Sequence, residues 1–366
     1  MTEWKTYRLG DVCSRLRSGK GIPASEVSAY GKFAVVGGNG VRGYTDKSNF
    51  NGQCVVVGRQ GAYCGNVRYF DGEFYMTEHA VVIVGNEYAD THFLAYLLSI
   101  MELGHLSAQS AQPGLSVQTL SKLKISLPPL DEQRRIAGIL GAIDDKIENN
   151  RRINTNLELQ AQALFDEWFI TNTSRLGVFS KAYLTDIANY LNGLAMQRFR
   201  PLEGEIGIPV LKIKELGQGQ CDSSSDLCSP SIEEKYIVRD GDIIFSWSGT
   251  LLVDIWCGGV CGLNQHLFTV TSDKYPQWFI YYWTKHHLAK FIRIAKDKAV
   301  TMGHIKRGDL EASEVLIPDE KSFAEMDKMM SPIFKAIVVN RIENRRLATL
   351  RDTLLPKLMN GEIITK

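Results

Sequence analysis

The chain contains a long internal repeat, and this feature constrains its fold more than any other. The motif at residues 7–12 returns at 183–187, so that Asp11 corresponds to Asp186, and Leu127-Pro128 returns as Ile317-Pro318. The separation between the copies is larger at the second motif than at the first, and from there on it stays constant. We therefore expect two similar domains that differ by insertions in their loops, each followed by a segment that tolerates no insertion.

The final segment of each copy carries a heptad seam, an apolar stripe that repeats every seven residues. Both seams begin after a proline, at Pro129 and Pro318, and the second meets the helix-stopping pair Asn360-Gly361. A helix packed only on its own domain would explain a short stripe, but this one exceeds four heptads, so we expect two long paired helices. The seam positions, which match one to one at a constant separation, are Ile136, Leu140, Ile143, Ile147, Asn150, Asn154, Leu157, Ala161, Leu164 and Trp168, then Met326, Met330, Ile333, Ile337, Asn340, Asn344, Leu347, Arg351, Leu354 and Leu358.

Two asparagines lie in the middle of each seam, Asn150 with Asn154 and Asn340 with Asn344. A buried amide lowers stability unless it meets a polar partner, so these layers are expected to align and to fix the register of the helices. In a parallel pair Asn150 faces Asn340, and in an antiparallel pair it faces Asn344; the residues alone leave both open. Helices of this length span roughly 50–60 Å, the scale of two DNA half-sites separated by a gap.

Composition indicates a soluble globular chain, with 44% apolar and 23% charged residues. No apolar run approaches the ~20 residues of a membrane span, and seven scattered cysteines do not form a disulfide framework, so a cytoplasmic address is expected. The net charge of +1 conceals an uneven distribution: residues 1–70 carry ten Lys/Arg against four Asp/Glu, and residues 281–308 carry seven against one. Such basic regions suit a nucleic acid, although ordinary solvated faces look the same.

The start of the first seam carries the pattern Pro-Pro-Leu-x-Glu-Gln-x-x-Ile at residues 128–136, and the second copy has Ile317-Pro318-Asp319-Glu320 in its place. With the repeat around it, this pattern resembles the specificity subunit of type I restriction-modification systems over essentially the whole chain. The resemblance implies an α+β fold, in which two similar α/β target recognition domains are joined by two long helices forming an antiparallel coiled coil with a pseudo-twofold repeat. The implied parts are a first recognition domain at 1–130, a first spacer helix at 131–172, a second recognition domain at 173–318 and a second spacer helix at 319–366.

The same resemblance implies a DNA specificity subunit that reads one half of a split double-stranded target with each domain. It implies two methyltransferase subunits and a motor-nuclease subunit as partners, with no catalytic site, cofactor or metal in this chain. Asp319 stands where the first copy has Pro129, which weakens the expectation of equal partner contacts. A protein-protein scaffold with repeated domains, or the DNA-reading subunit of a related restriction family, remains the alternative. Binding to duplex DNA that falls steeply with salt would separate DNA reading from a scaffold role.

Polar loops after two predicted buried strands, 53–58 and 242–245, are the strongest candidates for DNA contact. Arginine pairs with guanine and glutamine with adenine in the major groove, so Arg59 and Gln60 are interpreted as base readers. Trp247, at the matching place in the second copy, packs either on bases or on its own domain. Loops at 110–114 and 296–301 and the lysines near them suit phosphates, although a solvated surface charge explains any single lysine equally well. The DNA-binding candidates are Arg17, Lys20, Arg42, Arg59, Gln60, Tyr63, Gln112, Lys122, Lys124, Arg198, Ser246, Trp247, Ser248, Lys296, Lys298, Lys306 and Arg307.

Three other patterns do not support catalysis or metal binding. Residues 38–43 match G-x-G-x-x-G, but turn residues follow instead of a helix, so no dinucleotide site is expected and Arg42 is interpreted as a DNA contact in a flexible loop. Cys257, Cys261 and His266 lack a fourth zinc ligand at suitable spacing. His79 and His266 occupy matching places on apparent strands, which favours a shared core hydrogen bond over catalysis.

The spacer seam predicts the outcome of a matched insertion. Adding seven residues after Leu157 and seven near Leu347 should preserve both stripes and lengthen each helix by ~10.5 Å. The preferred gap between unchanged half-sites should then grow by about three base pairs, with weaker binding because one half-site also rotates around the duplex. Methylation of a library that varies only in gap length measures this; an unmoved optimum at full activity would contradict it.

Overall fold

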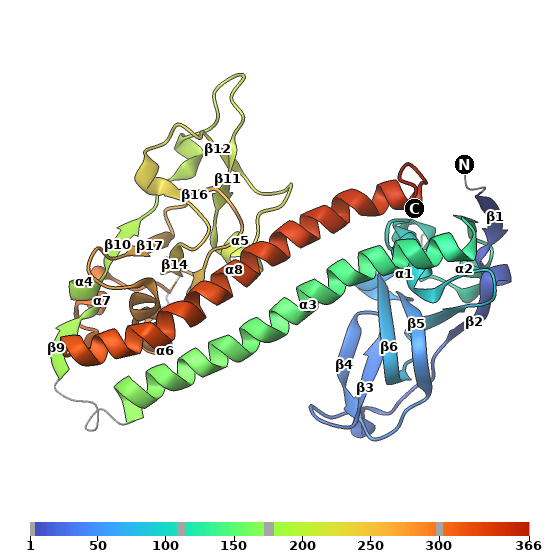
Figure 1. Cartoon of the computed structure of the whole chain (residues 1–366), viewed down its shortest axis with the longest axis horizontal. Helices are drawn as coiled ribbons and strands as arrows, with labels where there is room; N and C mark the ends of the chain where they lie inside the picture. The colour runs from blue at the N-terminus through green and yellow to red at the C-terminus, as the bar shows by residue number, and fades with distance from the viewer. Residues whose placement is uncertain (1–3, 108–113, 172–178, 298–302, 366) are drawn as a thin grey trace. The chain divides into compact units, whose positions relative to one another are not determined.

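The computed structural model describes residues 4–107, 114–171, 179–297 and 303–365, and the chain divides into two compact units. The first unit consists of Met1–Asp145 with Thr349–Lys366, and the second of Lys146–Ala348. The chain passes between the units inside its two longest helices, α3 (Leu130–Asp166) and α8 (Glu320–Met359), which Figure 1 draws in green and red. Each helix therefore contributes residues to both units.

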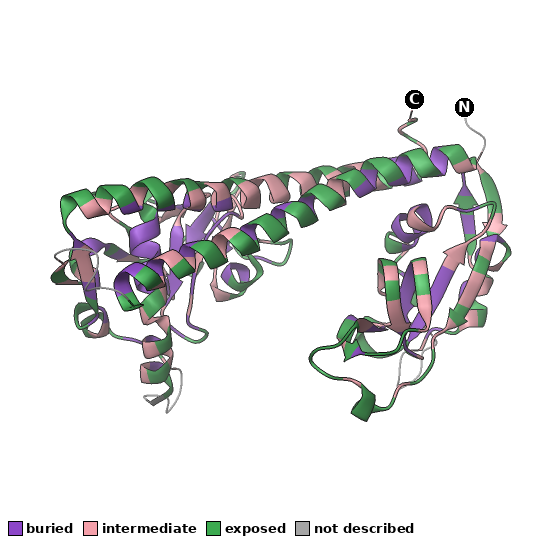
Figure 2. Ribbon diagram, turned by 60° about the horizontal axis from the view of Figure 1, so that its bottom comes forward, coloured by how far each residue is buried: buried purple, intermediate pink, exposed green. Residues whose placement is uncertain are grey.

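A six-stranded sheet in the order β2-β7-β5-β6-β3-β4 forms the core of the first unit. Phe93, Leu94 and Leu98 of α1 are fully buried in one apolar cluster with residues of β5 and β7. Figure 2 shows buried residues in the strands and helices of this unit, next to partly exposed and exposed ones. The elements are β1 (Lys5–Arg8), β2 (Cys13–Ser18), β3 (Phe33–Gly37), β4 (Gly40–Thr45), β5 (Phe50–Gly58), β6 (Val67–Met76), β7 (Ala80–Gly85), α1 (Thr91–Ser99), α2 (Val117–Ser121) and β8 (Lys124–Leu127), with 3-10 turns η1 (Leu9–Val12), η2 (Ala24–Glu26), η3 (Gly61–Tyr63) and η4 (Leu103–Leu106).

The second unit holds two four-stranded sheets, ordered β10-β17-β14-β15 and β12-β11-β16-β13. An aromatic cluster, including Trp278, Phe279 and Phe291 of α6, packs against the first of these sheets. The elements are the π-helical turn η5 (Glu167–Thr171), β9 (Phe179–Tyr183), α4 (Leu184–Ile187), β10 (Asn189–Asn192), η7 (Met196–Arg198), β11 (Ile208–Leu211), α5 (Ile213–Gln218), β12 (Leu227–Cys228), η8 (Glu234–Tyr236), β13 (Ile237–Val238), β14 (Ile243–Ser246), β15 (Leu252–Ile255), β16 (Cys261–Leu263), β17 (Leu267–Thr271), α6 (Gln277–Asp297), α7 (Arg307–Glu311) and β18 (Glu314–Pro318).

Strand pairing repeats between the units residue by residue. The strand β5 pairs with β7 as β14 pairs with β17, and β3 runs parallel to β6 as β11 runs parallel to β16. The small ladder of β1 and β8 likewise returns as β9 and β18. The sequence repeat is therefore a structural repeat, and the predicted fold class of two similar α/β domains with two long antiparallel helices is confirmed. Examples of matched pairs are Val55–Ile83 with Ile243–Val270, and Val36–Met76 with Leu211–Leu263.

One difference between the units has a clear cause. The single ten-residue strand β6 corresponds to two short strands, β15 and β16, in the second unit. Between them the indole of Trp256 is buried against Gly258 and donates its N–H to the Gly259 carbonyl at 2.6 Å. Gly259 has a φ of +94°, which glycine adopts at no steric cost, so the chain turns out of the strand here. This interruption separates the second unit's strands into two sheets.

The long helices run antiparallel and their asparagines pair across the seam. In the second unit Asn150 donates to the Asn344 side-chain carbonyl at 2.9 Å, and Asn340 donates to that of Asn154 at 2.8 Å. Asn154 also donates to the backbone carbonyl of Ile337 at 3.0 Å, so its buried amide is satisfied. The structure thus selects the antiparallel alternative, in which Asn150 faces Asn344. That these layers fix the register stays a prediction.

Ion pairs fasten α8 to the sheet domain of the second unit and to α3. In the second unit Arg345 donates to both carboxylate oxygens of Asp240, at 2.6 and 2.7 Å, and Arg341 bridges Asp254 and Glu158, both at 2.8 Å. These arginines are about one-third exposed or less, and bidentate geometry makes such pairs stronger than isolated surface pairs.

In the first unit the seam residue Arg351 also forms an ion pair. Arg351 donates to Asp144 at 2.7 Å, and Asp144 also accepts the Tyr96 hydroxyl at 2.6 Å. Burial, reinforced by this bond, holds the pKa of Tyr96 far above its ordinary value. A charged residue is therefore tolerated in the seam because Asp144 of α3, which also accepts the Tyr96 hydroxyl of α1, pairs with it.

Replacing Asn150 and Asn344 together by leucine should stabilise the helix pair by about 1 kcal/mol or more, since an apolar layer replaces a buried polar one. Asn150→Leu alone should instead destabilise it by roughly 1–3 kcal/mol, because the Asn344 amide loses its partner. Thermal unfolding of both variants measures this pair of effects. A double variant less stable than the single one would contradict the amide-layer interpretation.

Candidate nucleic-acid interface

The predicted reading loop of the first unit is joined by main-chain hydrogen bonds to two other segments. Arg59 directly follows β5, and its backbone N–H donates to the His79 carbonyl at 3.1 Å. The backbone N–H of Leu115 donates in turn to the Arg59 carbonyl at 2.9 Å, beside a bridge between Gln60 and Gly114. We call this meeting point of residues 59–60, 77–79 and 114–115 the first loop junction.

The second unit builds the same junction from the matching segments. The backbone N–H of Trp247 donates to the His266 carbonyl at 3.3 Å, and that of Ile305 donates to the Trp247 carbonyl at 3.2 Å. A bridge between Ser248 and His304 completes it. Residues 247–248, 264–266 and 303–305 form this second loop junction. Loops that are far apart in the sequence are thus brought together identically in both units.

Two glycines that sequence reasoning missed allow the close packing of each junction. A Cβ added to Gly19 would lie 2.1 Å from the Met76 carbonyl oxygen, and one added to Gly193 would lie 2.3 Å from that of Asn264. Both follow the strand at the sheet edge, β2 or β10, and both donate a backbone hydrogen bond across to the next strand. Their matching places in the two copies of the repeat are the signal that could have identified them.

The central side chain of the junction differs between the units. Arg59 is half-buried and its guanidinium makes a long hydrogen bond of 3.5 Å to the Ser18 hydroxyl at the end of β2. In the same place Trp247 donates its indole N–H to the Asn192 side-chain carbonyl at 2.9 Å, at the end of β10. One backbone frame therefore carries a cationic side chain in one unit and an aromatic one in the other.

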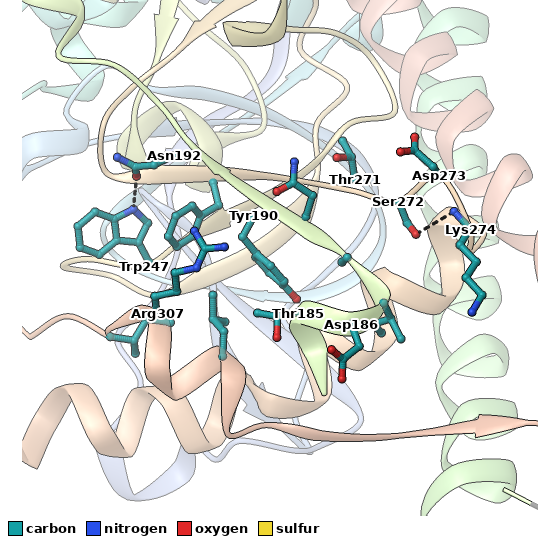
Figure 3. A pocket seen from close by; sticks show the side chains of 16 residues that line it. Thr185, Asp186, Tyr190, Asn192, Trp247, Thr271, Ser272, Asp273, Lys274 and Arg307 are labelled. Atoms are coloured by element: carbon teal, nitrogen blue, oxygen red, sulfur yellow. Dashed lines mark hydrogen bonds between the residues drawn. The ribbon is translucent and has the colours of Figure 1, made fainter. Parts of the chain in front are cut away.

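A cavity of about 600 Å³ opens beside Trp247 in the second unit (Figure 3). Its apolar wall contains Trp247 and Phe268, stacked with ring centroids 5.7 Å apart, and the buried ring of Tyr190. The Tyr190 hydroxyl is hydrogen-bonded to Thr284 at 2.8 Å, and burial holds the pKa of Tyr190 well above its ordinary value, so the phenol stays neutral. Figure 3 shows Arg307 reaching from α7 into the space between Trp247 and Tyr190.

The junction residues other than Arg59 and Trp247 differ in exposure. Gln60 is exposed and its side-chain carbonyl lies 3.1 Å from a ring nitrogen of His79. Tyr63 is exposed on η3. The structure corrects the prediction for Ser246, which is fully buried and donates to the Thr250 carbonyl at 2.8 Å, so it supports the loop from within. Ser248 is also buried.

The basic candidates lie on several elements. Arg17 is on β2, Lys20 follows it, Lys122 caps the end of α2, Lys124 begins β8 and Arg198 ends η7; all five are exposed. The exposed side chains of Lys306 and Arg307 lie at the start of α7. Gln112 and Lys298 lie outside the described residues.

Three predicted placements are wrong. Arg42 belongs to strand β4, because the glycine-rich segment forms the β3–β4 hairpin instead of a flexible loop. Lys296 lies within helix α6, which continues further than the loop expected there. His79 and His266 lie in turns just before β7 and β17 instead of on strands, and their backbone carbonyls accept the main-chain bonds of the junctions.

Metal and membrane features are absent from the described ranges. These ranges contain no group of three or more His, Cys, Asp or Glu side chains placed to hold a metal ion. Cys261 faces Cys221, with 3.5 Å between the sulfur atoms, and both thiols are free. No helix in this part of the chain is long and apolar enough to span a bilayer.

Comparison with known proteins shows similarity to type I restriction-modification specificity subunits. Residues 1–159 match the model of the type I restriction modification DNA specificity domain. This match spans less than half of the chain and shows that its first part is similar to that family. The predicted resemblance is thereby confirmed.

Curated specificity subunits are similar to different parts of this chain. The EcoprrI specificity subunit of Escherichia coli is 32% identical over 47% of the chain, which spans 45% of that relative's length. The MjaIX specificity subunit of Methanocaldococcus jannaschii is 28% identical over 75% of the chain and 69% of its own. The crystal structure of a type I S subunit from M. genitalium has the same fold, with a TM-score of 0.71 and 17% identity over 98% of this chain and 96% of that one.

The glycine contacts predict a selective loss of stability. Gly193→Ala should destabilise the second unit by roughly 1–3 kcal/mol, because the added methyl group meets backbone atoms that cannot move aside. Gly217→Ala, in α5 with no atom within 4 Å of the added carbon, is the matched control and should be neutral or slightly stabilising. Chemical denaturation of both variants measures the difference, and equal stabilities would argue against the close approach.

Proposed function

We propose that this chain is the DNA sequence-specificity subunit of a type I restriction-modification complex and reads a bipartite target, one half with each unit. The observation that carries the proposal is the loop junction, which occurs twice with the same main-chain bonds and different central side chains. A repeated frame with a varied side chain is what a protein needs to read two different half-sites with one architecture. The similarity of residues 1–159 to the type I DNA specificity domain supports the same conclusion.

Arg59 and Gln60 are the base readers of the first half-site in this proposal. The guanidinium of Arg59 suits the paired acceptors of guanine, and the exposed Gln60 amide suits adenine. The exposed lysines Lys122 and Lys124, with Lys20 and Arg17, suit phosphate contacts, which position the domain without specifying a base. In the second unit Lys306 and Arg307 take the phosphate role beside Trp247.

Chemistry on the DNA would come from partner subunits. Two methyltransferase subunits would transfer methyl groups, and a motor-nuclease subunit would join for cleavage, while this chain would recognise the target sequence. The relatives that carry the family's name are specificity subunits, which supports a non-catalytic role. A cytoplasmic location follows from a partner and target of this kind.

Two substitutions separate base reading from phosphate binding. Arg59→Ala should weaken binding to the matched first half-site by about 1–3 kcal/mol and leave mismatched DNA nearly unchanged. Lys122→Ala should weaken binding to all sequences about equally and reduce the slope of affinity against salt. Equilibrium binding of matched and mismatched duplexes across a salt series measures both. Equal losses on both duplexes from Arg59→Ala would make Arg59 a phosphate contact.

A further inference from the structure

The cavity beside Trp247 has a lining that belongs to the second unit alone. Four of its residues, Trp247, Phe268, Tyr190 and Arg307, are three aromatic side chains and a cation. The strand registers and helix starts match these positions to residues of a different kind in the first unit. The corresponding residues are Arg59, Val81, Leu16 and Val117. A flat aromatic wall with an arginine at its side is therefore an addition to the shared frame.

The polar groups of this wall are already satisfied inside the protein. The Trp247 indole N–H is bound to Asn192, and the Tyr190 hydroxyl to Thr284. What remains for a ligand is the surface of the aromatic rings, which attracts another planar ring by stacking and burial. The occupant should therefore present a flat ring face to this wall and need no specific hydrogen bond from Trp247 or Tyr190.

The charged side chains around the cavity favour an anionic group of a ligand at one end, beside Arg307. Arg307 lies at the Trp247 end, and its partner Glu311 is 3.5 Å away with both side chains more than half exposed, a pairing that contributes little and exchanges readily. Asp186 is engaged by the backbone N–H of Tyr183 at 2.8 Å. Figure 3 shows Asp273 and Lys274 at the opposite end of the cavity, where their charges offset each other.

We propose that this cavity holds one nucleotide of the second half-site, rotated out of the duplex, with its base against Trp247, Phe268 and Tyr190 and its phosphate near Arg307. The proposal rests on the proposed DNA-reading function. The first unit would read bases within the groove through Arg59, whereas the second unit would bind one base outside the duplex. A volume of about 600 Å³ lies within the range of ligand pockets that enclose a small molecule. Trp247 belongs both to the second loop junction and to the cavity lining. A base displaced from DNA at the junction would therefore have only a short distance to move into the cavity.

Mismatched DNA tests the proposal, because the change in binding affinity has opposite signs for a base read in the groove and for a displaced base. After the target is mapped by methylation, each pair of the second half-site is mismatched by changing one strand only, and the full chain is titrated with each duplex. A base read in the groove binds worse when its pair is broken. A base taken out of the stack binds better, because less pairing is lost, and one position should gain about tenfold in affinity.

Variants of the cavity lining test whether this gain in affinity depends on the cavity. The gain should vanish in Trp247→Ala, persist in Trp247→Phe, which keeps a ring for stacking, and shrink in Arg307→Gln, an exposed change that leaves the core intact. Tyr30→Ala, which removes an exposed aromatic ring of the first unit, is the control and should keep the whole gain.

Each other outcome overturns the inference. Sequence-specific binding in which every mismatch weakens affinity would leave the DNA-reading function standing and remove the nucleotide from the cavity. A gain that survives both Trp247→Ala and Arg307→Gln would place the displaced base elsewhere. If these two variants reduce association with a methyltransferase subunit and keep the wild-type mismatch profile, the cavity serves a protein partner. Absence of any sequence-specific binding would instead refute the proposed function, and the inference with it.

Discussion

We expect the amide layers between α3 and α8 to be the constraint on which the rest of the structure depends. An apolar seam alone could slide by one heptad with little change in buried area, whereas Asn150 and Asn154 are paired with Asn344 and Asn340 in this alignment, so we expect the amides to fix the register. Both helices contribute residues to both units, so this alignment decides which residues of α8 reach each sheet domain. In this register Arg341, Arg345 and Arg351 meet their carboxylates.

The architecture was predictable from the sequence because its signals are periodic and occur twice. The heptad stripe, the proline starts and the constant separation between the two seams each report on backbone geometry, which the hydrophobic pattern encodes directly. Helix direction was not predictable from the residues alone, because Asn150 can pair with Asn340 or Asn344 equally well until tertiary contacts choose. The resemblance to a known family supplied the antiparallel direction, and the structure agrees with it.

The candidate site was predictable only in part. Arg59, Gln60 and Trp247 were found because a polar loop after a buried strand is a local pattern. The cavity was missed because Tyr190, Phe268 and Arg307 come from segments whose proximity depends on strand register and not on spacing along the chain. Arg42 and Lys296 were misplaced because glycine-rich and basic segments were assigned to loops, where pairing with β3 and continuation of α6 extend regular structure.

The loop junctions are held together by main-chain atoms, and this has an evolutionary consequence. Backbone N–H and carbonyl groups are the same in every residue except proline, so the frame does not depend on which side chain stands at position 59 or 247. A single nucleotide change in the gene can therefore replace the central side chain while the domain still folds. The chain contains two natural outcomes of that freedom, an arginine and a tryptophan, mounted on one scaffold. Under the proposed function, such a protein can acquire a new half-site preference without first acquiring a new fold.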